Sequence, residues 1–360
     1  MHHHQEAKWI ENTPLSIQQV QSASEETINT DRHEPIVVDE AKDTTSDGKY
    51  RKSLMDSIYE SKFGYWFIQL SKCMKMFGRL MVLLSVTGLV YTYYFYFFIT
   101  LPMMNTQTWT YLFHLILGIY IMIAISFYYA KAVLTNPGNT PQDWIYSCNI
   151  DDFKSDANAG KGKTKWCSRC QQPKPPRVHH CHICQQCVLR MDHHCPWLNN
   201  CVGLHNHKYF LGFTFFLALA ADWNIFMISF GLIGIYEPEP VLYEAWSGWL
   251  MFNLVLCVVT GIALSFLTAL HFYLIITNQT TIEFQFGKLN HMIDKKLKST
   301  PYVNQFEVDV KTNIQQVLGK AANPNSYWEL AALLLLINTK KPPCDGLNYP
   351  TIQHQKDDVV

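Results

Sequence analysis

Four long apolar stretches constrain the fold of this chain more than any other feature of its sequence. They are Leu80–Leu101, Trp109–Ala130, Tyr209–Tyr236 and Trp249–Thr277. Their titratable residues are His114 in the second stretch, Asp222 in the third and His271 in the fourth. A helix needs about 20 residues to cross the hydrocarbon core of a bilayer. One such stretch would also fit a buried helix of a soluble protein, but four in one chain favour an α-helical integral membrane protein with four transmembrane helices.

The composition agrees with apolar residues that are concentrated in segments. Only 16% of the residues are charged, whereas the mean hydropathy of the whole chain is −0.04, so the remaining segments must be polar. The net charge is zero, which lacks the basic signature of a nucleic-acid-binding protein. We therefore expect the lipid bilayer as a partner and no nucleic acid.

The distribution of lysine and arginine predicts the orientation of the helices. Ten of these residues lie between Lys131 and Lys208, in the loop between the second and third stretches. In contrast, Met103–Thr108 carries no charge and Glu237–Gly248 carries no basic residue. Because basic residues favour the cytosolic side, both termini and the central loop are predicted to be cytosolic.

These boundaries divide the chain into six expected segments. The first fifty residues contain ten acidic and four basic residues and no apolar core, so we expect a disordered arm and no cleavable signal peptide. The segment Leu330–Ile337 is apolar but too short to span, so it is expected to pack against the helices or lie in the membrane interface. The segments are a cytosolic arm (1–50), a basic pre-membrane segment (51–79), helices one and two (80–138), a cytosolic cysteine-rich domain (139–208), helices three and four (209–277) and a cytosolic C-terminal region (278–360).

A repeat of cysteine and histidine organises the central loop. Seven of the eleven cysteines lie between Cys167 and Cys201, together with five histidines. Two sets of three cysteines and one histidine recur after fourteen residues, and each is the donor set of a closed tetrahedral zinc site. The clustered, odd number of thiols beside imidazoles favours metal sites over a disulfide framework. The two predicted zinc sites are Cys167, Cys170, His180 and Cys187, and Cys181, Cys184, His194 and Cys201.

Cys195 is the cysteine of this region that the repeat leaves unused. A third copy would begin at Cys195, but its second ligand position is Leu198, so the pattern is expected to stop. The same shift pairs His179 with His193 and leaves both outside the metal sets. A thiol beside an imidazole and a carboxylate is typical of an activated nucleophile, because the imidazole takes the thiol proton. From the spacing alone, Cys195 is either such a nucleophile, with His193 and Asp192, or a spare ligand or buried thiol.

Three functional classes without this nucleophile were weighed against it. A zinc finger for nucleic acid is disfavoured because the cysteine-rich region lies between two apolar stretches. A thiol–disulfide relay is disfavoured by the predicted reducing side of the membrane and by the metal-type repeat. A zinc-stabilised membrane adaptor that binds proteins without acting on them is the remaining alternative, and loss of Cys195, His193 or Asp192 would favour it.

The region from Cys167 to Phe210 resembles the DHHC family of protein S-acyltransferases, also called palmitoyltransferases. It carries the family's run C-x2-C-x3-K-P-x-R-x-H-H-C-x2-C-x2-C-x4-D-H-H-C-P-W-x-N-N-C-V-G-x2-N-H-x-Y-F without a gap. Thr280–Glu283 matches the family's TTxE element, and the sequence around Asn313 and Tyr327-Trp328 resembles its C-terminal motif. Two departures stand outside this core: Asn136-Pro137-Gly138 replaces Asp-Pro-Gly, and Glu329-Leu330-Ala331 replaces a Leu-Pro element.

The resemblance implies a two-step transfer of a palmitoyl group. Cys195 would take the acyl group from acyl-CoA and pass it to cytosolic cysteines of membrane-associated proteins, with His193 as the base and Asp192 orienting it. It also implies that Trp197 covers the thioester and that Thr281 hydrogen-bonds near Asp192. We expect Lys165 and Lys174 to bind the CoA phosphates, although both lysines would also suit anionic lipid headgroups. The two zinc ions would be structural, and the protein would reside in the endoplasmic reticulum or Golgi membrane.

Overall fold

The computed structural model describes residues 62–105, 108–148, 165–232, 237–238, 240–285, 304–321 and 327–351. All of them belong to one compact unit, Tyr59–Val360. The predicted N-terminal arm, 1–50, lies outside the described residues.

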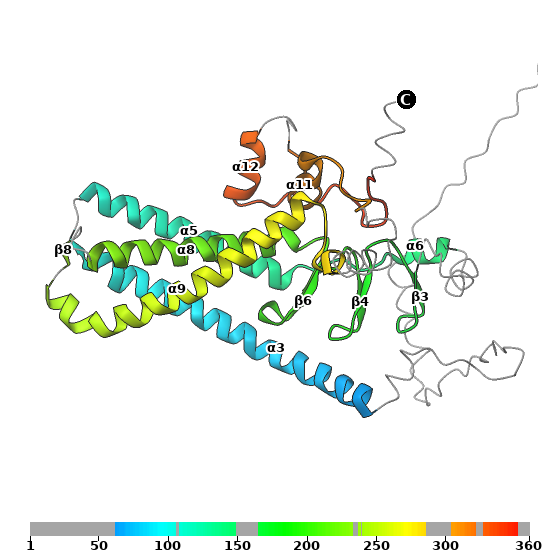
Figure 1. The fold of residues 1–360 in the computed structure, drawn as a ribbon, viewed down its shortest axis with the longest axis horizontal. Helices are drawn as coiled ribbons and strands as arrows, with labels where there is room; N and C mark the ends of the chain where they lie inside the picture. The colour runs from blue at the N-terminus through cyan, green and yellow to red at the C-terminus, as the bar shows by residue number, and fades with distance from the viewer. Residues whose placement is uncertain are drawn as a thin grey trace, which may run out of the picture. The chain divides into compact units, whose positions relative to one another are not determined.

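Four long helices form the apolar part of the described chain (Figure 1). Their apolar portions, Met74–Met103, Thr108–Leu134, His207–Leu232 and Trp246–Ile276, are long and apolar enough to cross a membrane. This confirms the four predicted spans, with bounds that differ by several residues, and residues 233–236 of the third stretch lie outside the described part. The helices are α3 (Lys62–Phe95), α5 (Thr108–Leu134), α8 (His207–Leu232) and α9 (Pro240–Ile276).

The first helix continues beyond α3 with a change of pitch. A π-helical turn, η1 (Tyr96–Thr100), leads into the short helix α4 (Leu101–Met103). The ends of the two helical hairpins are joined by an antiparallel pair, in which β1 (Met104–Asn105) lies beside β8 (Glu237–Pro238). This pairing links the short loop after α4 to the loop before α9.

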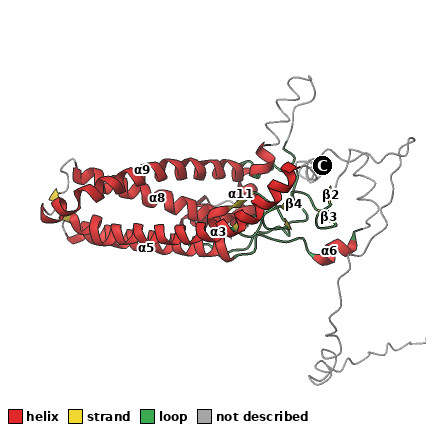
Figure 2. Ribbon diagram, turned by 90° about the horizontal axis from the view of Figure 1, so that it is seen from below, coloured by secondary structure: helices red, strands yellow, loops and turns green. Residues whose placement is uncertain are grey.

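Helix α8 is the central helix of this bundle. It packs against both α5 and α9, and the three helices run side by side in both views (Figure 2). Of the most apolar segment of this helix, 61% is buried inside the protein, compared with 17% to 28% for the corresponding segments of the other three helices. The other helices expose large apolar side chains such as Phe98, Ile116 and Phe266, as expected for surfaces that face lipid.

The cysteine-rich region folds as three consecutive two-stranded hairpins. The nearest hairpin to the helices contains β6, and the hairpins of β4 and β3 follow outward (Figure 1). Each first strand ends on a cysteine, and each turn contains a residue with positive φ: Gln171, Gln185 or Asn199. The hairpins pair β2 (Lys165–Cys167) with β3 (Gln172–Lys174), β4 (His179–Cys181) with β5 (Gln186–Val188), and β6 (His193–Cys195) with β7 (Asn200–Val202).

The fourteen-residue repeat is therefore a repeat of backbone as well as of ligands. The register places Cys167 opposite Gln172, Cys181 opposite Gln186 and Cys195 opposite Asn200. The ligand pattern ends after two copies, but the backbone pattern continues through a third. A short 3₁₀ turn, η2 (Pro196–Leu198), occupies the place of the zinc-binding turn in this third hairpin.

The connection after α5 keeps its turn despite the replacement of the family's aspartate. The Asn136 side chain accepts a hydrogen bond of 2.8 Å from the Gly138 backbone N–H, and Gly138 has φ +113°. The Gly138 carbonyl then accepts a hydrogen bond from the Leu189 N–H. The turn thus joins the helices to the second hairpin, ahead of the short helix α6 (Gln142–Ser147).

The C-terminal region packs on the helices through two further segments, α11 (Val310–Leu318) and α12 (Tyr327–Leu335). Leu333 of α12 and Val317 of α11 share an apolar cluster with Leu211 and Ile275. The α12 segment, predicted to pack against the helices or lie in the interface, therefore docks on α8 and α9. It does so without the Leu-Pro element. The side chain of Asn313 also donates a hydrogen bond of 2.8 Å to the carbonyl of Ile276 at the end of α9.

Candidate active site and metal sites

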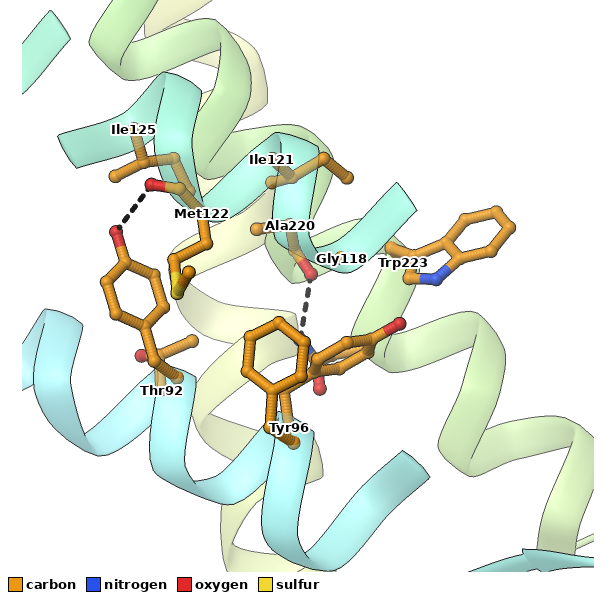
Figure 3. A pocket seen from close by; sticks show the side chains of 11 residues that line it. Thr92, Tyr96, Gly118, Ile121, Met122, Ile125, Ala220 and Trp223 are labelled. Carbon is orange, nitrogen blue, oxygen red and sulfur yellow. Dashed lines mark hydrogen bonds between the residues drawn. The ribbon is translucent and has the colours of Figure 1, made fainter. Parts of the chain in front are cut away.

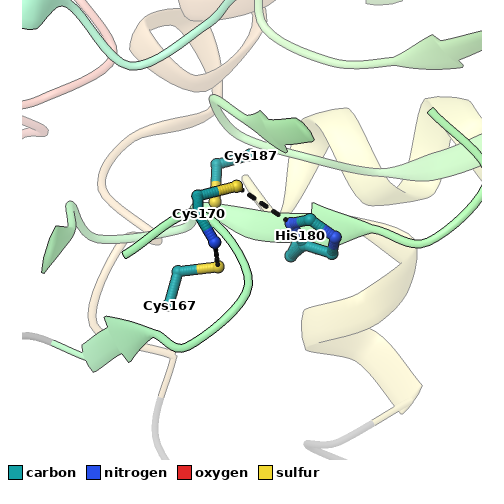
Figure 4. A group of neighbouring side chains, drawn as sticks. All are labelled: Cys167, Cys170, His180 and Cys187. Carbon is teal, nitrogen blue, oxygen red and sulfur yellow. Dashed lines mark hydrogen bonds between the residues drawn. The ribbon is translucent and has the colours of Figure 1, made fainter. Parts of the chain in front are cut away.

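The first predicted ligand set is gathered by the first two hairpins (Figure 4). The donor atoms of Cys167, Cys170, His180 and Cys187 all lie within 4.8 Å of one another. The Sγ of Cys170 is 3.2 Å from the Nδ1 of His180. The first two donors come from the turn of the first hairpin, and the other two come from the paired strands of the second.

The second set repeats this arrangement one hairpin further along. The Nδ1 of His194 lies 3.8, 3.3 and 3.7 Å from the sulfur atoms of Cys181, Cys184 and Cys201. A tetrahedral zinc ion with Zn–S of about 2.3 Å and Zn–N of about 2.0 Å separates its ligand atoms by about 3.5–3.8 Å. The donor set and its spacing therefore fit a structural zinc ion.

The same atoms do not form a disulfide. The sulfur atoms of Cys184 and Cys201 are 3.5 Å apart, whereas a disulfide bond measures about 2.05 Å. All the described cysteines are free thiols. The backbone N–H of Cys170 points at the Cys167 sulfur at 3.4 Å, and that of Cys184 points at the Cys181 sulfur at 3.3 Å. These donors stabilise sulfur in the thiolate form that binds a metal.

Cys195 belongs to neither set. It begins the third turn. Leu198, which is 1% exposed, occupies the position that corresponds to the second ligand of the other two turns. Both residues belong to the apolar cluster formed with Tyr129 of α5 and Phe213 of α8. The third turn thus packs on the helices in place of a metal, and it carries its thiol to the boundary between the helices and the hairpins.

Asp192 and His193 form a hydrogen-bonded pair beside this thiol. The Nδ1 of His193 donates to Oδ2 of Asp192 at 2.7 Å. Since Nδ1 carries the proton of this bond, Nε2 is the nitrogen that remains to accept a proton. Thr281 also binds Asp192, through its hydroxyl to Oδ2 at 2.7 Å and through its backbone N–H to Oδ1 at 2.9 Å. The carboxylate, which is fully buried, is therefore held by three donors.

The electrostatics of the pair favour an ionised Asp192 and a strongly basic His193. Burial alone would raise the pKa of Asp192, but the hydrogen bond from His193 and the nearby His207 hold it well below its usual range. Burial likewise would lower the pKa of His193, but the hydrogen bond to Asp192 and the neighbouring Cys195 raise it to about 9. His193 is thus positioned to hold a proton next to the Cys195 sulfur.

One ring nitrogen of His271 approaches this pair. A donor atom of each of Asp192, His193 and His271 lies within 4.8 Å of the others. The Asp192 oxygens and the His193 Nδ1 already bind one another and Thr281. The arrangement is therefore that of an orienting carboxylate and a base, rather than that of a third metal site.

A buried ion pair anchors the TTxE element to the second hairpin. The guanidinium of Arg177 binds both carboxylate oxygens of Glu283 at 2.8 Å and also donates to the side chain and carbonyl of Asn278. It lies over the rings of Phe306 and Tyr349, with its Cζ 4.5 and 4.9 Å from their centroids. Sequence reasoning did not identify this contact. The motif matches at Arg177 and Glu283 were the signal for it, but they do not say that the two residues meet.

A small pocket of about 30 Å³ lies between the helices of the bundle (Figure 3). Side chains of α3, η1, α5 and α8 line it, and almost all of them are apolar or aromatic. Ile121, Ile125 and Ala220 line the cavity and also belong to the apolar cluster that contains Cys195. Tyr96 lies against Gly118, and Trp223 closes another part of the wall (Figure 3). The cavity and the thiol therefore belong to one packed region.

The remaining predicted site residues belong to the first and third hairpins. Trp197 is 54% exposed in η2, and its carbonyl accepts a hydrogen bond of 3.1 Å from the Tyr129 hydroxyl. Lys165 and Lys174 are opposite partners in the first hairpin. The side chain of Lys174 is half-buried, and that of Lys165 lies outside the described part.

Comparison with known proteins gives consistent matches. Residues 160–288 match the family model of the DHHC palmitoyltransferase. The chain is 33% identical over 199 residues to probable protein S-acyltransferase 16 of Arabidopsis thaliana, which covers 53% of this chain and 67% of that protein. It is 36% identical over 193 residues to palmitoyltransferase ZDHHC15 of Xenopus laevis, covering 53% of this chain and 51% of the relative. It is 31% identical over 196 residues to human palmitoyltransferase ZDHHC2, covering 53% and 47%.

Proposed function

Because this chain belongs to the DHHC palmitoyltransferase family, we propose that it is a protein S-acyltransferase whose acyl-enzyme forms on Cys195. The observation that carries the assignment is the position of this thiol. Cys195 lies outside both metal sets and shares an apolar cluster with the lining of the bundle cavity. A spare ligand would lie with the other donor atoms, and an inert buried thiol would not adjoin a hydrogen-bonded His193–Asp192 pair.

The first step moves the acyl group from CoA to the enzyme. His193 accepts the thiol proton of Cys195, and Asp192 and Thr281 hold the resulting imidazolium in place. The Cys195 sulfur forms a bond to the thioester carbonyl carbon, and the bond from that carbon to the CoA sulfur breaks. CoA takes the proton from His193 as it leaves.

The second step returns the enzyme to its starting state. A cytosolic cysteine of a membrane-associated protein gives its proton to His193, and its sulfur attacks the acyl-Cys195 thioester. The bond to Cys195 breaks, and this thiol recovers the proton from His193. The net reaction transfers one acyl group from acyl-CoA to a protein thiol and makes the acceptor a lipoprotein.

We propose that the acyl chain of a long-chain donor such as palmitoyl-CoA lies along the pocket of the bundle. Apolar and aromatic side chains of α3, η1, α5 and α8 form its wall, so an alkyl chain would exchange water for an apolar environment. Trp197 lies two residues after Cys195 and exposes its ring, and we assign to it the cover over the reacting thioester.

The first hairpin suits the charged part of the donor. Its register puts Lys165 and Lys174 opposite each other, and two like charges in such positions destabilise a hairpin unless an anion lies between them. We propose that the CoA phosphates bind here. Neutralising both lysines should raise the KM for acyl-CoA without altering membrane association, whereas lysines that served only lipid headgroups would give the reverse result.

The metal sites would hold the hairpins rigid. Zinc bound by three thiolates and one imidazole has no open position, so it supplies structure and no Lewis-acid chemistry. Cys187 and His180 for the first ion, and Cys201 and His194 for the second, come from the hairpin after the turn that gives the other two ligands. Each ion would thereby fasten consecutive hairpins and fix the third one, which carries Cys195.

The apolar helices make this a multi-pass membrane protein, and we propose that its hairpins and both termini face the cytosol. Basic residues concentrate between α5 and α8, which favours that side. We further propose residence in the endoplasmic reticulum or Golgi membrane. Protease protection of epitope tags at each terminus and at the β1–β8 loops would test the orientation, and fluorescence microscopy with organelle markers would test the location.

The central experiment detects the acyl-enzyme directly. Purified protein is incubated with palmitoyl-CoA, digested and examined by mass spectrometry for a hydroxylamine-labile palmitoyl group on the Cys195 peptide. The Cys195→Ser variant should lose both this group and transfer to a protein thiol while it keeps two zinc ions per chain. Absence of the group from a wild-type protein with two zinc ions would favour the adaptor alternative, and a fall to one zinc ion in the variant would make Cys195 a ligand.

A further inference from the structure

Two buried histidines accompany the Asp192–His193 pair, and the proposed reaction steps use neither of them. His207 is the first residue of α8 and His271 lies near the end of α9, and their exposed fractions are 0% and 2%. Polar side chains so deeply buried cost free energy unless they are hydrogen-bonded. Both are hydrogen-bonded, and these bonds form one continuous line from Arg190 through His207 to His271.

That line begins at Arg190, which precedes Asp192 by two residues and is 1% exposed. Its Nη1 lies 3.0 Å from the Nδ1 of His207. The Nε2 of His207 lies 3.1 Å from the Nδ1 of His271. A ring nitrogen of His271 in turn lies within 4.8 Å of Asp192 and His193 donor atoms.

Arginine fixes the direction of every bond in this line. A guanidinium only donates, so the Nδ1 of His207 must accept and its proton must sit on Nε2. That proton is donated to the Nδ1 of His271, so His271 in turn carries its proton on Nε2. Each ring has its Nδ1 occupied as an acceptor, and neither ring can take up a second proton while the line is intact.

We propose that His207 and His271 are positioning residues, which Arg190 orients and which hold His193 and Asp192 in register with the Cys195 thiol. This inference rests on the proposed function of that pair. The rings also pack on one another: His207 and His271 lie edge to face with centroids 5.3 Å apart, and His193 and His271 lie at a tilt with centroids 5.8 Å apart. Phe210 contacts both His193 and His271 and closes the side of the stack.

The line has a chemical consequence for the proton that His193 holds. A neighbouring imidazole could accept this proton from His193 if the neighbouring ring had a free nitrogen. Since the Nδ1 of His271 is already occupied by the His207 proton, the proton stays between His193 and Cys195. His271 thus restrains the pair without joining the proton transfer.

The test uses Cys195 reactivity, which does not require acyl-CoA. The alkylation rate of Cys195 by iodoacetamide is followed by mass spectrometry of its peptide in wild type, His271→Phe, His193→Ala and the double variant. Phenylalanine keeps the ring but removes both nitrogens. We expect His271→Phe to slow alkylation about 10- to 100-fold, the loss that a misplaced catalytic group produces, and to add nothing in the His193→Ala background.

Controls separate positioning from folding. Thr268 lies one turn from His271 on α9, is buried and has an unpartnered hydroxyl, so Thr268→Val should keep the wild-type rate. His271→Asn retains an acceptor for His207 and should recover most of the rate. Zinc content and melting temperature identify variants that fold. If His271→Phe does not fold, the cycle is run with His207→Asn, which keeps an acceptor for Arg190 but is too short for its amide to reach His271.

Two results would overturn the inference. One is a wild-type alkylation rate in a folded variant that breaks the His207–His271 bond. The other is a loss that adds fully to that of His193→Ala, because it would show that His271 acts independently of His193. A protein whose Cys195 alkylates normally but never accepts an acyl group would refute the proposed acyltransferase function and leave the positioning role standing.

Discussion

The hydroxyl of Thr281 donates a hydrogen bond of 2.7 Å to the same oxygen of Asp192 that accepts the Nδ1–H of His193. These residues are 89 positions apart in the chain, and the contact joins the segment after α9 to the third hairpin. The segment that follows α9 and the hairpin that carries His194 and Cys201 therefore share one carboxylate. A shift at the end of α9 would therefore displace Asp192 and, through it, the base His193 beside Cys195.

The first prediction concerns this shared carboxylate. Thr281→Val removes the hydroxyl donor but keeps the backbone N–H bond to Asp192. Hydrogen bonds to charged groups contribute about 1.5–3 kcal/mol, so acyl-enzyme formation should slow about tenfold or more, while zinc content is unchanged. Thr277→Val is the matched control, because the Thr277 hydroxyl binds only carbonyls of its own helix. Equal rates in the two variants would argue against a role for the Thr281 hydroxyl.

The second prediction separates ligands from the nucleophile. Cys181→Ala leaves three donors at the second metal site, and binding energy at such sites is also folding energy. Expression yield, melting temperature and zinc content should therefore fall together. Cys195→Ala should keep two zinc ions, as measured by inductively coupled plasma mass spectrometry. A well-folded Cys181→Ala protein with two tightly held ions would show that the ligand sets are assigned wrongly.

The third prediction concerns pH. The pKa of His193 is raised to about 9 in the folded protein, compared with about 6.5 for an unperturbed histidine. The stabilisation from its protonated form is thus complete below about pH 6.5 and disappears as the pH rises through about 9. The difference in melting temperature between wild type and His193→Gln should shrink across this interval. A difference that stays constant from pH 6 to 10 would contradict the ion pair.

The fourth prediction concerns the cavity. A Cβ at Gly118 would collide with the Cε1 of Tyr96, so Gly118→Ala must displace this ring, which lines the pocket. Two methylenes contribute about 1.6 kcal/mol of apolar burial, and the preference for sixteen- over fourteen-carbon acyl-CoA should fall by up to about 15-fold. Gly88→Ala on α3 meets no atom within 4 Å and should leave the preference unchanged, as competition assays would measure.

Local chemistry explains what the sequence could predict. Apolar runs of bilayer length and ligands that recur every fourteen residues are properties of neighbouring residues, so the four helices and both ligand sets were predictable. Long-range contacts were not. Arg177 and Glu283 are 106 positions apart, and no local pattern says that they pair. The turn of the third hairpin also holds no ligand pair of its own, because Leu198 packs against α5 and α8 where a ligand would otherwise be needed.

Asp222 shows the same limit inside a helix. Because an ionised acid inside a span costs free energy, the sequence predicts that Asp222 faces the bundle interior and binds His114, His271, Asn224 or Asn253. The structure instead leaves it exposed and places it 3.5 Å from the hydroxyl of Ser265 on α9, close to Gly261. Its neighbours Trp223 and Asn224 line the cavity, but Asp222 does not. The expectation was wrong because the rotation of α8 is set by its packing against two other helices, which the sequence of one helix does not contain.

The third hairpin also bears on how a reactive thiol avoids capture. A sulfur placed among zinc-binding turns would ordinarily compete for the metal, and a filled site would silence it. Here the second ligand position is Leu198, which is 1% exposed. A metal ion at Cys195 would therefore meet an apolar side chain in place of a second donor. One apolar side chain thus prevents this turn from binding a metal and leaves the Cys195 thiol available as a nucleophile. A cysteine at this position would complete a further ligand pair and would turn the Cys195 sulfur from a nucleophile into a structural metal ligand.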